Sequence, residues 1–360
     1  MSLTQTILRS APVAALTSPH GVDRYLELVN PLWAAHEVRA RVVRIRRETH
    51  EVTTLTLHPT NTWQGFAAGQ HVQVGVEIDG TRHTRCFSIS SSDLARKLRG
   101  DRTFTITVRA HEDGIVSKHL AHRADVGTVL HLSQAEGEFM LPPLLPRKLL
   151  MISGGSGITP LMSMLRTLVD FRYEGRITFV HYARTPEETI FADELDEVAQ
   201  LPNVDLTLVH TRTGAKRFNE LQLKALAPTY AATPTYVCGP AGLVAAVTEL
   251  YDAHGAAEQL HVEYFKTSTL DVDPTDATGT IGFTRAGQTA PNSGATLLEQ
   301  AEALGLRPAY GCRMGICFTC TTRKTEGTVR NVVTGAESSV PDDDIQICVS
   351  QPVGSCAIDL

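Results

Sequence analysis

The sequence predicts a multidomain protein in which an antiparallel β-barrel is followed by an α/β unit with a parallel sheet and by a separate small C-terminal unit. Short alternating runs bounded by Gly and Asp turns fill residues 38–140, which is typical of a small antiparallel barrel. From Lys148 onward, strands alternate with helical stretches, which indicates a parallel sheet with right-handed crossovers. A polar stretch without periodicity then separates the last unit. We therefore expect an N-terminal extension at 1–36, a barrel at 37–143, an α/β domain at 144–266, a linker at 267–276 and a last domain at 277–360.

The composition is that of a folded protein without a strongly charged surface. The 360 residues are 42% hydrophobic and 20% charged, which argues against a disordered chain. A formal net charge of −6 argues against a nucleic-acid-binding protein. We find neither an apolar window long enough for a membrane span nor the basic start of a secretory signal, so we expect a cytoplasmic protein with no transmembrane segment of its own.

The N-terminal extension contains one candidate helix, over residues 23–33. Tyr25, Leu26, Val29 and Leu32 recur on one side of it, and the proline at position 31 limits its length. The extension is therefore either a strap that packs on the barrel or a docking element for a partner protein.

The densest chemical signal is a group of cysteines near the C-terminus. Cys312, Cys317 and Cys320 have the spacing C-x4-C-x2-C, and Cys348 follows after 27 intervening residues. This is the plant-type pattern of ligands for a 2Fe–2S cluster. A structural zinc site would more often show two C-x2-C pairs, and seven cysteines, an odd number, argue against a disulfide framework.

On this motif, residues 278–360 resemble a plant-type ferredoxin. The resemblance implies a β-grasp fold of the α+β class, with the cluster near one surface. Thr296 and Glu299 form a capping box that predicts a helix, which Gly305 closes. From Leu270 onward the unit carries 11 acidic and 6 basic residues, which favours either a charged docking face or a solvated one.

A glycine loop opens the α/β unit. Residues 152–160 read ISGGSGITP, between a strand and a helix, where a diphosphate can sit on backbone amides at the positive helix end. Together with the later CGP at 238–240, this loop resembles the nicotinamide domain of the ferredoxin–NADP reductase superfamily. The resemblance implies that Thr159 and Cys238 flank the nicotinamide ring, although Cys238 could also be a buried thiol at a strand end. The implied coenzyme-binding residues are Gly154, Gly155, Gly157, Thr159, Pro160, Cys238, Gly239 and Pro240.

Three arginines favour NADPH over NADH as the coenzyme. Arg184, Arg212 and Arg217 lie near strand ends or in the loops that follow. A 2′-phosphate is a dianion that forked guanidinium groups hold well, and NADPH-preferring members of the superfamily carry arginines in similar settings.

Two motifs in the barrel indicate a flavin. Arg85-Cys86-Phe87-Ser88 is similar to the R-x-Y-S motif of the superfamily, which implies a cation for the diphosphate, an aromatic ring beside the isoalloxazine and a hydroxyl near its N5. Phe87 keeps the ring but removes the tyrosine hydroxyl. Gly114, Val116 and Ser117 match the G-x-x-S turn at the flavin phosphates, and the domain order resembles FAD-containing members.

The end of the α/β unit carries a weaker resemblance. His261–Phe265 is similar to the E-x-F ending of the superfamily, which implies that Glu263 lies near the nicotinamide and Phe265 near the flavin. A terminal core strand would explain the same residues.

The combined resemblance, over residues 38–360, implies a reductase in which NADPH reduces FAD and a 2Fe–2S cluster passes electrons to a partner protein. The segment GVDRYLELVNPLWA looks most like reductases that serve membrane di-iron acyl-CoA desaturases in actinobacteria, which would place the protein peripherally at the membrane through its partner. The alternative is the reductase component of a soluble multicomponent monooxygenase or dioxygenase. A redox sensor would show broken cofactor loops, and a dehydrogenase acting on a small quinone would leave the ferredoxin unit without a purpose.

Overall fold

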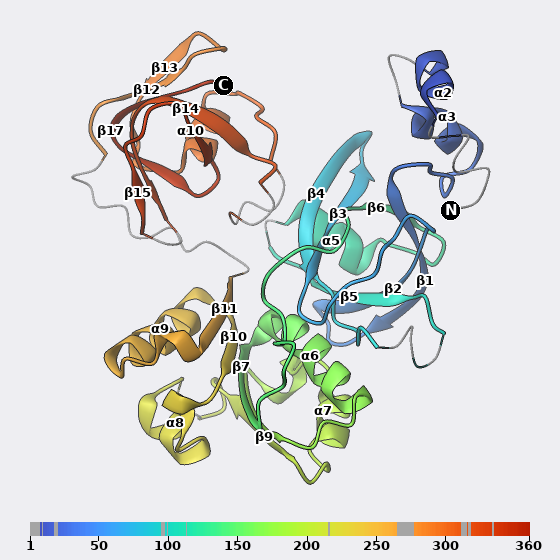
Figure 1. Cartoon of the computed structure of the whole chain (residues 1–360), viewed down its shortest axis with the longest axis vertical. Coiled ribbons are helices and arrows are strands. Elements are labelled where there is room, and N and C mark those ends of the chain that lie inside the picture. The colour runs from blue at the N-terminus through green and yellow to red at the C-terminus, as the bar shows by residue number, and fades with distance from the viewer. Residues whose placement is uncertain are drawn as a thin grey trace. The chain divides into compact units, whose positions relative to one another are not determined.

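The computed structural model describes residues 8, 10–17, 21–94, 98, 100–112, 114–214, 217–264, 277–310, 315, 318–332 and 335–360. The chain divides into two compact units, Met1–Glu263 and Tyr264–Leu360. The first unit holds the barrel and the α/β sheet, and the second holds a further sheet (Figure 1). Every helix in the described ranges is too short or too polar to cross a membrane.

Six antiparallel strands form the predicted barrel, in the order β4-β3-β6-β1-β2-β5. Ile89, just after β4, bridges Ile106 of β5, so the two edge strands meet and the sheet closes. Trp63 stacks on Phe104 inside, with ring centroids 4.9 Å apart. The barrel elements are β1 (Val38–Arg47), β2 (Val52–Pro59), β3 (His71–Ile78), β4 (Thr81–Ser88), β5 (Phe104–Arg109), α5 (Ile115–His122) and β6 (Val129–Leu132).

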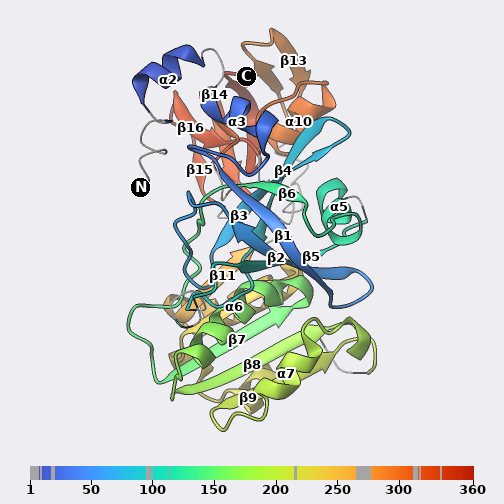
Figure 2. The same ribbon diagram turned by 90° about the vertical axis from the view of Figure 1, so that its right-hand side faces the viewer.

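The α/β part is a sheet in the order β11-β10-β7-β8-β9, with parallel pairing from β10 through β9, as predicted. Helices α6 and α7 lie on one face, and α8 and α9 lie on the other (Figures 1 and 2). The strand order reverses at β7, so the carboxyl ends of β7 and β10 flank the crevice where ligands bind in such sheets. The elements are β7 (Lys148–Gly154), α6 (Ile158–Asp170), β8 (Arg176–Ala183), α7 (Ala192–Val198), β9 (Val204–His210), α8 (Glu220–Leu226), β10 (Thr235–Gly239), α9 (Ala241–Ala253) and β11 (Leu260–Tyr264).

The second unit is a mixed sheet that curls around one helix, as the predicted β-grasp fold requires. Parallel pairing of β12 with β17 joins the β12–β13 hairpin to the antiparallel pair of β14 and β17, and the apolar side of α10 is buried against the sheet. The predicted capping box is present: Thr296 Oγ1 accepts from the Glu299 amide, and Glu299 Oε2 accepts from the Thr296 amide. The elements are β12 (Thr280–Phe283), β13 (Gln288–Pro291), α10 (Leu297–Ala303), β14 (Thr321–Asn331), β15 (Glu337–Ser338), β16 (Asp343–Gln346) and β17 (Ser350–Ile358).

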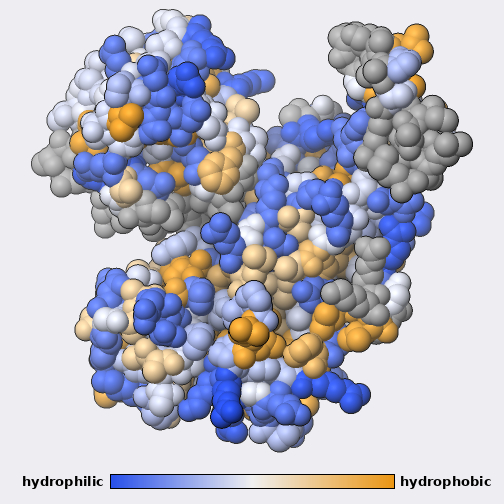
Figure 3. Space-filling model, viewed as in Figure 1, coloured by the Kyte–Doolittle hydropathy of each residue, from blue (hydrophilic) through white to orange (hydrophobic). Residues whose placement is uncertain are grey.

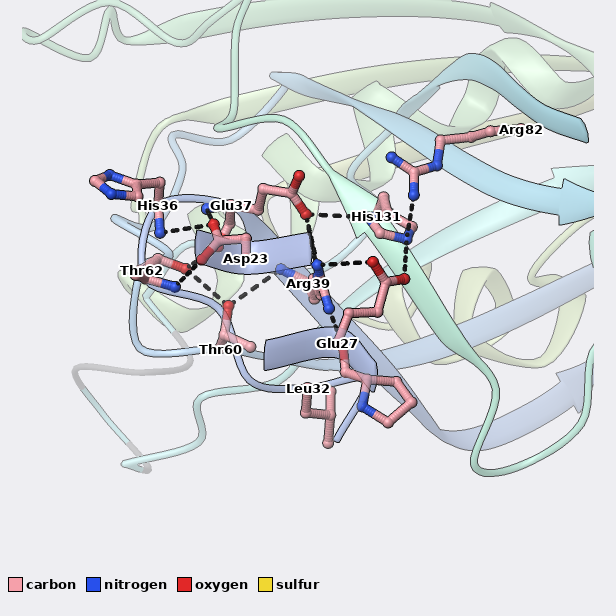
Figure 4. Close-up of polar contacts among 12 residues, drawn as sticks. Asp23, Glu27, Leu32, His36, Glu37, Arg39, Thr60, Thr62, Arg82 and His131 are labelled. Atoms are coloured by element: carbon pink, nitrogen blue, oxygen red, sulfur yellow. Dashed lines mark hydrogen bonds and ion pairs between the residues drawn. The ribbon is translucent and has the colours of Figure 1, made fainter. Parts of the chain in front are cut away.

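The N-terminal extension packs on the barrel through polar rather than apolar contacts. It contains α2 (Ala11–Leu16) and α3 (Val22–Val29). The guanidinium of Arg39, only 1% exposed, donates to the carbonyl of Pro31 at 2.8 Å and forms ion pairs with Glu27 at 3.3 Å and Glu37 at 2.8 Å (Figure 4). A buried guanidinium needs such partners, so the acidic side of α3 faces inward.

The apolar residues predicted on one side of the helix are only partly covered: Leu26 and Leu32 are half-buried, whereas Tyr25 and Val29 are exposed. The helix also ends at Val29 rather than at residue 33. Tyr25 is 44% exposed and Val29 is 71% exposed. Leu28 and Trp33 are also exposed, and orange residues are visible on the N-terminal helices in Figure 3.

We expect Asp23→Ala to loosen the extension from the barrel. The Asp23 carboxylate accepts hydrogen bonds from the amides of residues 35, 36 and 37, and a buried donor that loses its acceptor costs about 1–3 kcal/mol. Hydrogen exchange at these amides and proteolysis within residues 21–34 should both accelerate, whereas the exposed neighbour change Arg24→Ala should leave both unchanged. Equal protection in the two variants would contradict this account of the strap.

Candidate functional site

The glycine loop and the end of β10 touch so closely that only glycine fits between them. A Cβ on Gly157 would lie 2.3 Å from the Cys238 carbonyl oxygen, and one on Gly239 would lie 3.0 Å from the Gly154 amide nitrogen. Gly155 has a φ of +52°, a left-handed conformation that glycine adopts without strain. The fold thus brings the two predicted coenzyme segments together at the crevice beside β7.

Cys238 is a neutral thiol in this setting. It is fully buried, and burial together with the charge of Glu263 raises the pKa of the Cys238 thiol well above its ordinary value. A thiol that resists ionisation is a poor nucleophile, so the side chain offers a small packing surface rather than covalent chemistry. Thr159 lies in the first turn of α6, where its hydroxyl donates to the Ser156 carbonyl at 3.0 Å. Pro160 follows it in that turn, and Pro240 precedes α9 as its N-cap.

The three predicted arginines follow neighbouring strands of the sheet. Arg184 comes directly after β8, and its carbonyl accepts the Arg212 amide at 2.8 Å, which joins the loops after β8 and β9. Arg217 is exposed in the segment before α8. The Arg184 side chain is already engaged, with Glu188 and with Glu51 of the barrel. A phosphate dianion could therefore bind directly to the exposed guanidinium groups of Arg212 and Arg217. It could bind to Arg184 only through the part of the guanidinium group that the two carboxylates leave open.

Sequence reasoning missed a fourth arginine at this crevice. Arg109 ends β5, and its Nη1 lies 3.5 Å from the position that a Cβ on Gly155 would take. Its other edge holds Glu51, with Nε at 3.1 Å and Nη2 at 2.9 Å from Oε2. An arginine at the end of a barrel strand carries no local signal of nucleotide contact, so only the folded chain reveals it.

The flavin motif of β4 places a cation and an aromatic ring on the same face. Strand alternation puts Arg85 and Phe87 on one face of the sheet, while Ser88 is buried on the other. The cross-strand partners of Arg85 and Phe87 in β3 are Val74 and Val72, respectively. Cys86 alternates to the same face as Ser88 and is partly buried. A guanidinium and a ring spaced two residues apart suit a diphosphate and the flat ring system that continues from it.

The start of α5 forms the second part of the flavin site. A Cβ on Gly114 would lie 2.1 Å from Ser117 Oγ, which accepts from the His111 amide at 3.2 Å and donates to the Gly114 carbonyl at 3.3 Å. Val116 points into the barrel core, so only its backbone can meet a ligand. Backbone amides at the beginning of a helix suit flavin phosphates, so these residues fit the group.

Two of the four predicted cluster ligands lie within the described residues. Cys320 and Cys348 are both buried in the core of the second unit, whereas Cys312 and Cys317 lie outside the described residues. Gln346 Nε2 donates to the Gly315 carbonyl at 2.8 Å, and this bond holds Gly315 at the end of β16, just before Cys348. The two buried thiols fit a cluster site. Phe265, predicted near the flavin, also lies outside the described residues.

A cavity of about 690 Å³ among the described residues lies elsewhere. It opens between the barrel and helices α6 and α7, and none of the predicted site residues lines it. Its lining includes both acidic and basic side chains.

Three known domain families match consecutive parts of the chain: the oxidoreductase FAD-binding domain over residues 39–140, the oxidoreductase NAD-binding domain over 151–249 and the 2Fe-2S iron-sulfur cluster binding domain over 283–353. An NADPH oxidoreductase of Mycobacterium tuberculosis is 36% identical over 353 residues, which cover 96% of this chain and 90% of that protein. The glycine betaine monooxygenase reductase subunit of Chromohalobacter salexigens is 30% identical, over 91% of this chain and 96% of its own. The solved structure of phthalate dioxygenase reductase has the same fold, with a TM-score of 0.61 at 22% identity, over 89% of this chain and 97% of that one.

We expect Gly157→Ala to displace the glycine loop. Its methyl group would overlap the Cys238 carbonyl, and overpacking of this kind typically destabilises by about 1–3 kcal/mol. Urea unfolding should shift to lower midpoints, and calorimetry should show weaker binding of ADP-ribose. Gly242→Ala is the matched control, because a Cβ there meets nothing within 4 Å. Unchanged binding by the Gly157 variant would contradict the assignment of the loop.

Proposed function

Because this chain belongs to the family of NAD(P)H oxidoreductases that join FAD-binding, NAD-binding and 2Fe–2S domains, we propose that it takes electrons from NADPH and delivers them to a terminal desaturase or oxygenase protein. The observation that carries the proposal is the presence of all three domains, in order, in one chain. When bound, the flavin and the cluster supply the conversion of a two-electron hydride donor into single electrons. The residues of this chain bind, orient and shield these groups.

We assign the following roles to the residues of this chain. Arg85, the start of α5 and Ser117 would hold the flavin diphosphate, and Phe87 would lie beside the ring with Ser88 near N5. The glycine loop would hold the coenzyme diphosphate on its amides, and Thr159 and Cys238 would flank the nicotinamide, with Glu263 nearby. Cys312, Cys317, Cys320 and Cys348 would hold the cluster.

The proposed preference for NADPH rests on Arg184, Arg212 and Arg217. Arg212 and Arg217 are exposed and Arg184 is adjacent to Arg212, so the three can converge on one dianion. The Mycobacterium tuberculosis relative is named for its use of NADPH, which supports the same choice.

For the acceptor, we favour a membrane fatty acyl-CoA desaturase. The support is the N-terminal segment GVDRYLELVNPLWA, which resembles reductases that serve such desaturases. The exposed apolar side of α3, carried by Tyr25, Leu28 and Val29, is available for contact with such a partner. The second candidate is the reductase component of a soluble oxygenase, which the glycine betaine monooxygenase reductase subunit favours.

Reconstitution separates the two acceptors. We expect the purified protein with NADPH to support double-bond formation by an acyl-CoA desaturase in vesicles, because the cluster would donate single electrons to its iron. Turnover with a soluble ring-hydroxylating or glycine betaine oxygenase is the comparison arm. Turnover in that arm alone would replace the desaturase by the soluble oxygenase.

Coenzyme preference has its own prediction. The double variant Arg212→Ala/Arg217→Ala should lower kcat/KM for NADPH by roughly tenfold or more and change that for NADH little, since each charge-assisted hydrogen bond is worth about 1.5–3 kcal/mol. Exposed Arg147, changed to Ala, is the control. An equal loss for both coenzymes would show that these arginines do not bind the 2′-phosphate.

Two buried cysteines of the second unit provide a matched test of the cluster. Cys348→Ser removes a proposed ligand, whereas Cys356→Ser changes a buried thiol outside the ligand set. We expect the first variant to lose iron and acid-labile sulfide and to fail with the partner, while still reducing ferricyanide with NADPH. The second should keep the iron content of the parent protein. Zinc without iron in the parent protein, or full partner turnover by Cys348→Ser, would contradict the proposal.

A further inference from the structure

A single carboxylate connects two arginines that come from different domains of the first unit. Glu51 lies in the turn between β1 and β2. Its Oε2 accepts from Arg109 Nε at 3.1 Å and Nη2 at 2.9 Å, and from Arg184 Nη2 at 3.3 Å. Glu51 of the barrel therefore forms an ion pair with Arg184, which follows β8 of the nucleotide sheet.

In both arginines, the Nε and Nη2 atoms of the guanidinium group donate to carboxylates. Arg109 uses Nε and Nη2 for Glu51, and Arg184 uses Nε for Glu188 and Nη2 for Glu51. Among the hydrogen bonds of the described residues, Nη1 of either arginine takes no part. The Nη1 of Arg109 lies beside the glycine loop, 3.5 Å from the Cβ position of Gly155.

The two cations would not stay together without the acid between them. Because both bond to one oxygen atom, their Nη2 atoms lie at most about 6.2 Å apart. Like charges at this separation repel, and Glu51 offsets the repulsion while fixing the orientation of each fork. The hydrogen bond from Arg109 lowers the pKa of Glu51, and the charges of Arg109 and Arg184 add to this, so the carboxylate stays ionised near neutral pH.

We propose that Glu51 is a positioning residue that presents the Nη1 edge of Arg109 to the diphosphate of the pyridine dinucleotide on the glycine loop, while its bond to Arg184 keeps that second cation beside Arg212. The inference rests on the proposed use of a pyridine dinucleotide but not on a preference for NADPH. Glu51 does not touch the ligand in this account. Its effect on binding of the diphosphate passes through Arg109.

The test is calorimetric binding of ADP-ribose, which carries the diphosphate but no 2′-phosphate. Glu51→Gln keeps the shape of the side chain and removes its charge. We expect its Kd to rise about five- to twentyfold, because the guanidinium group of Arg109 loses its fixed orientation. The control is Glu187→Gln, which removes an equal charge from an exposed side chain three residues after Arg184. Its Kd should stay within about twofold of the parent value.

Two further measurements separate positioning from loss of fold. KM for NADPH should rise in Glu51→Gln while kcat at saturation, flavin content and the melting temperature stay near the parent values. In an Arg109→Gln/Arg184→Gln background, adding Glu51→Gln should have no further effect on the Kd, because the arginines through which it acts are gone.

Three results would overturn the inference. Tighter binding of ADP-ribose by Glu51→Gln would show that the carboxylate repels the ligand instead of preparing its site. An unchanged Kd, with normal binding by the parent protein, would remove the positioning effect but leave the proposed function intact. No binding of ADP-ribose by the parent protein would remove both.

Discussion

The nucleotide part of this molecule depends on one close approach, between the glycine loop after β7 and the end of β10. The Cys238 carbonyl occupies the space that any side chain at position 157 would need. Since β7 and β10 are adjacent parallel strands, this approach sets the path of the loop and the point at which α6 begins. The thiol of Cys238, the hydroxyl of Thr159 and the amides of the loop then all lie at the carboxyl ends of β7 and β10.

Charge is the second constraint on the fold. Buried and exposed arginines differ in how many of their donors have partners within the protein. Arg39 is buried and has two carboxylates and a carbonyl as partners. Arg109 and Arg184 lie at a surface crevice and share one carboxylate, which leaves part of each guanidinium for other contacts. Desolvation explains the contrast, because a fully buried guanidinium requires nearly all of its donors to be satisfied.

The features that the sequence predicted well are local ones. The spacing of the cysteines, the glycine loop and the capping box at Thr296 each lie within a few neighbouring residues, and periodicity identified the barrel and the parallel sheet. The features it could not predict depend on residues far apart in the chain. Glu51 lies in the turn before β2 and Arg109 at the end of β5, and the orientation of α3 depends on a charge at Arg39 that no helical periodicity reveals. Val116 matched a motif by position, yet its side chain belongs to the core.

The polar attachment of α3 determines which residues of this extension can be substituted during evolution. The carboxylates that fasten the helix all face the barrel, and Leu28, Val29 and Trp33 contribute little to that attachment because they are exposed. Outward side chains can therefore be exchanged without weakening the anchor, whereas Glu27 must stay matched to Arg39 and Asp23 to the amides of residues 35–37. In such an extension, the residues that hold the helix and those that face solvent can change independently of one another.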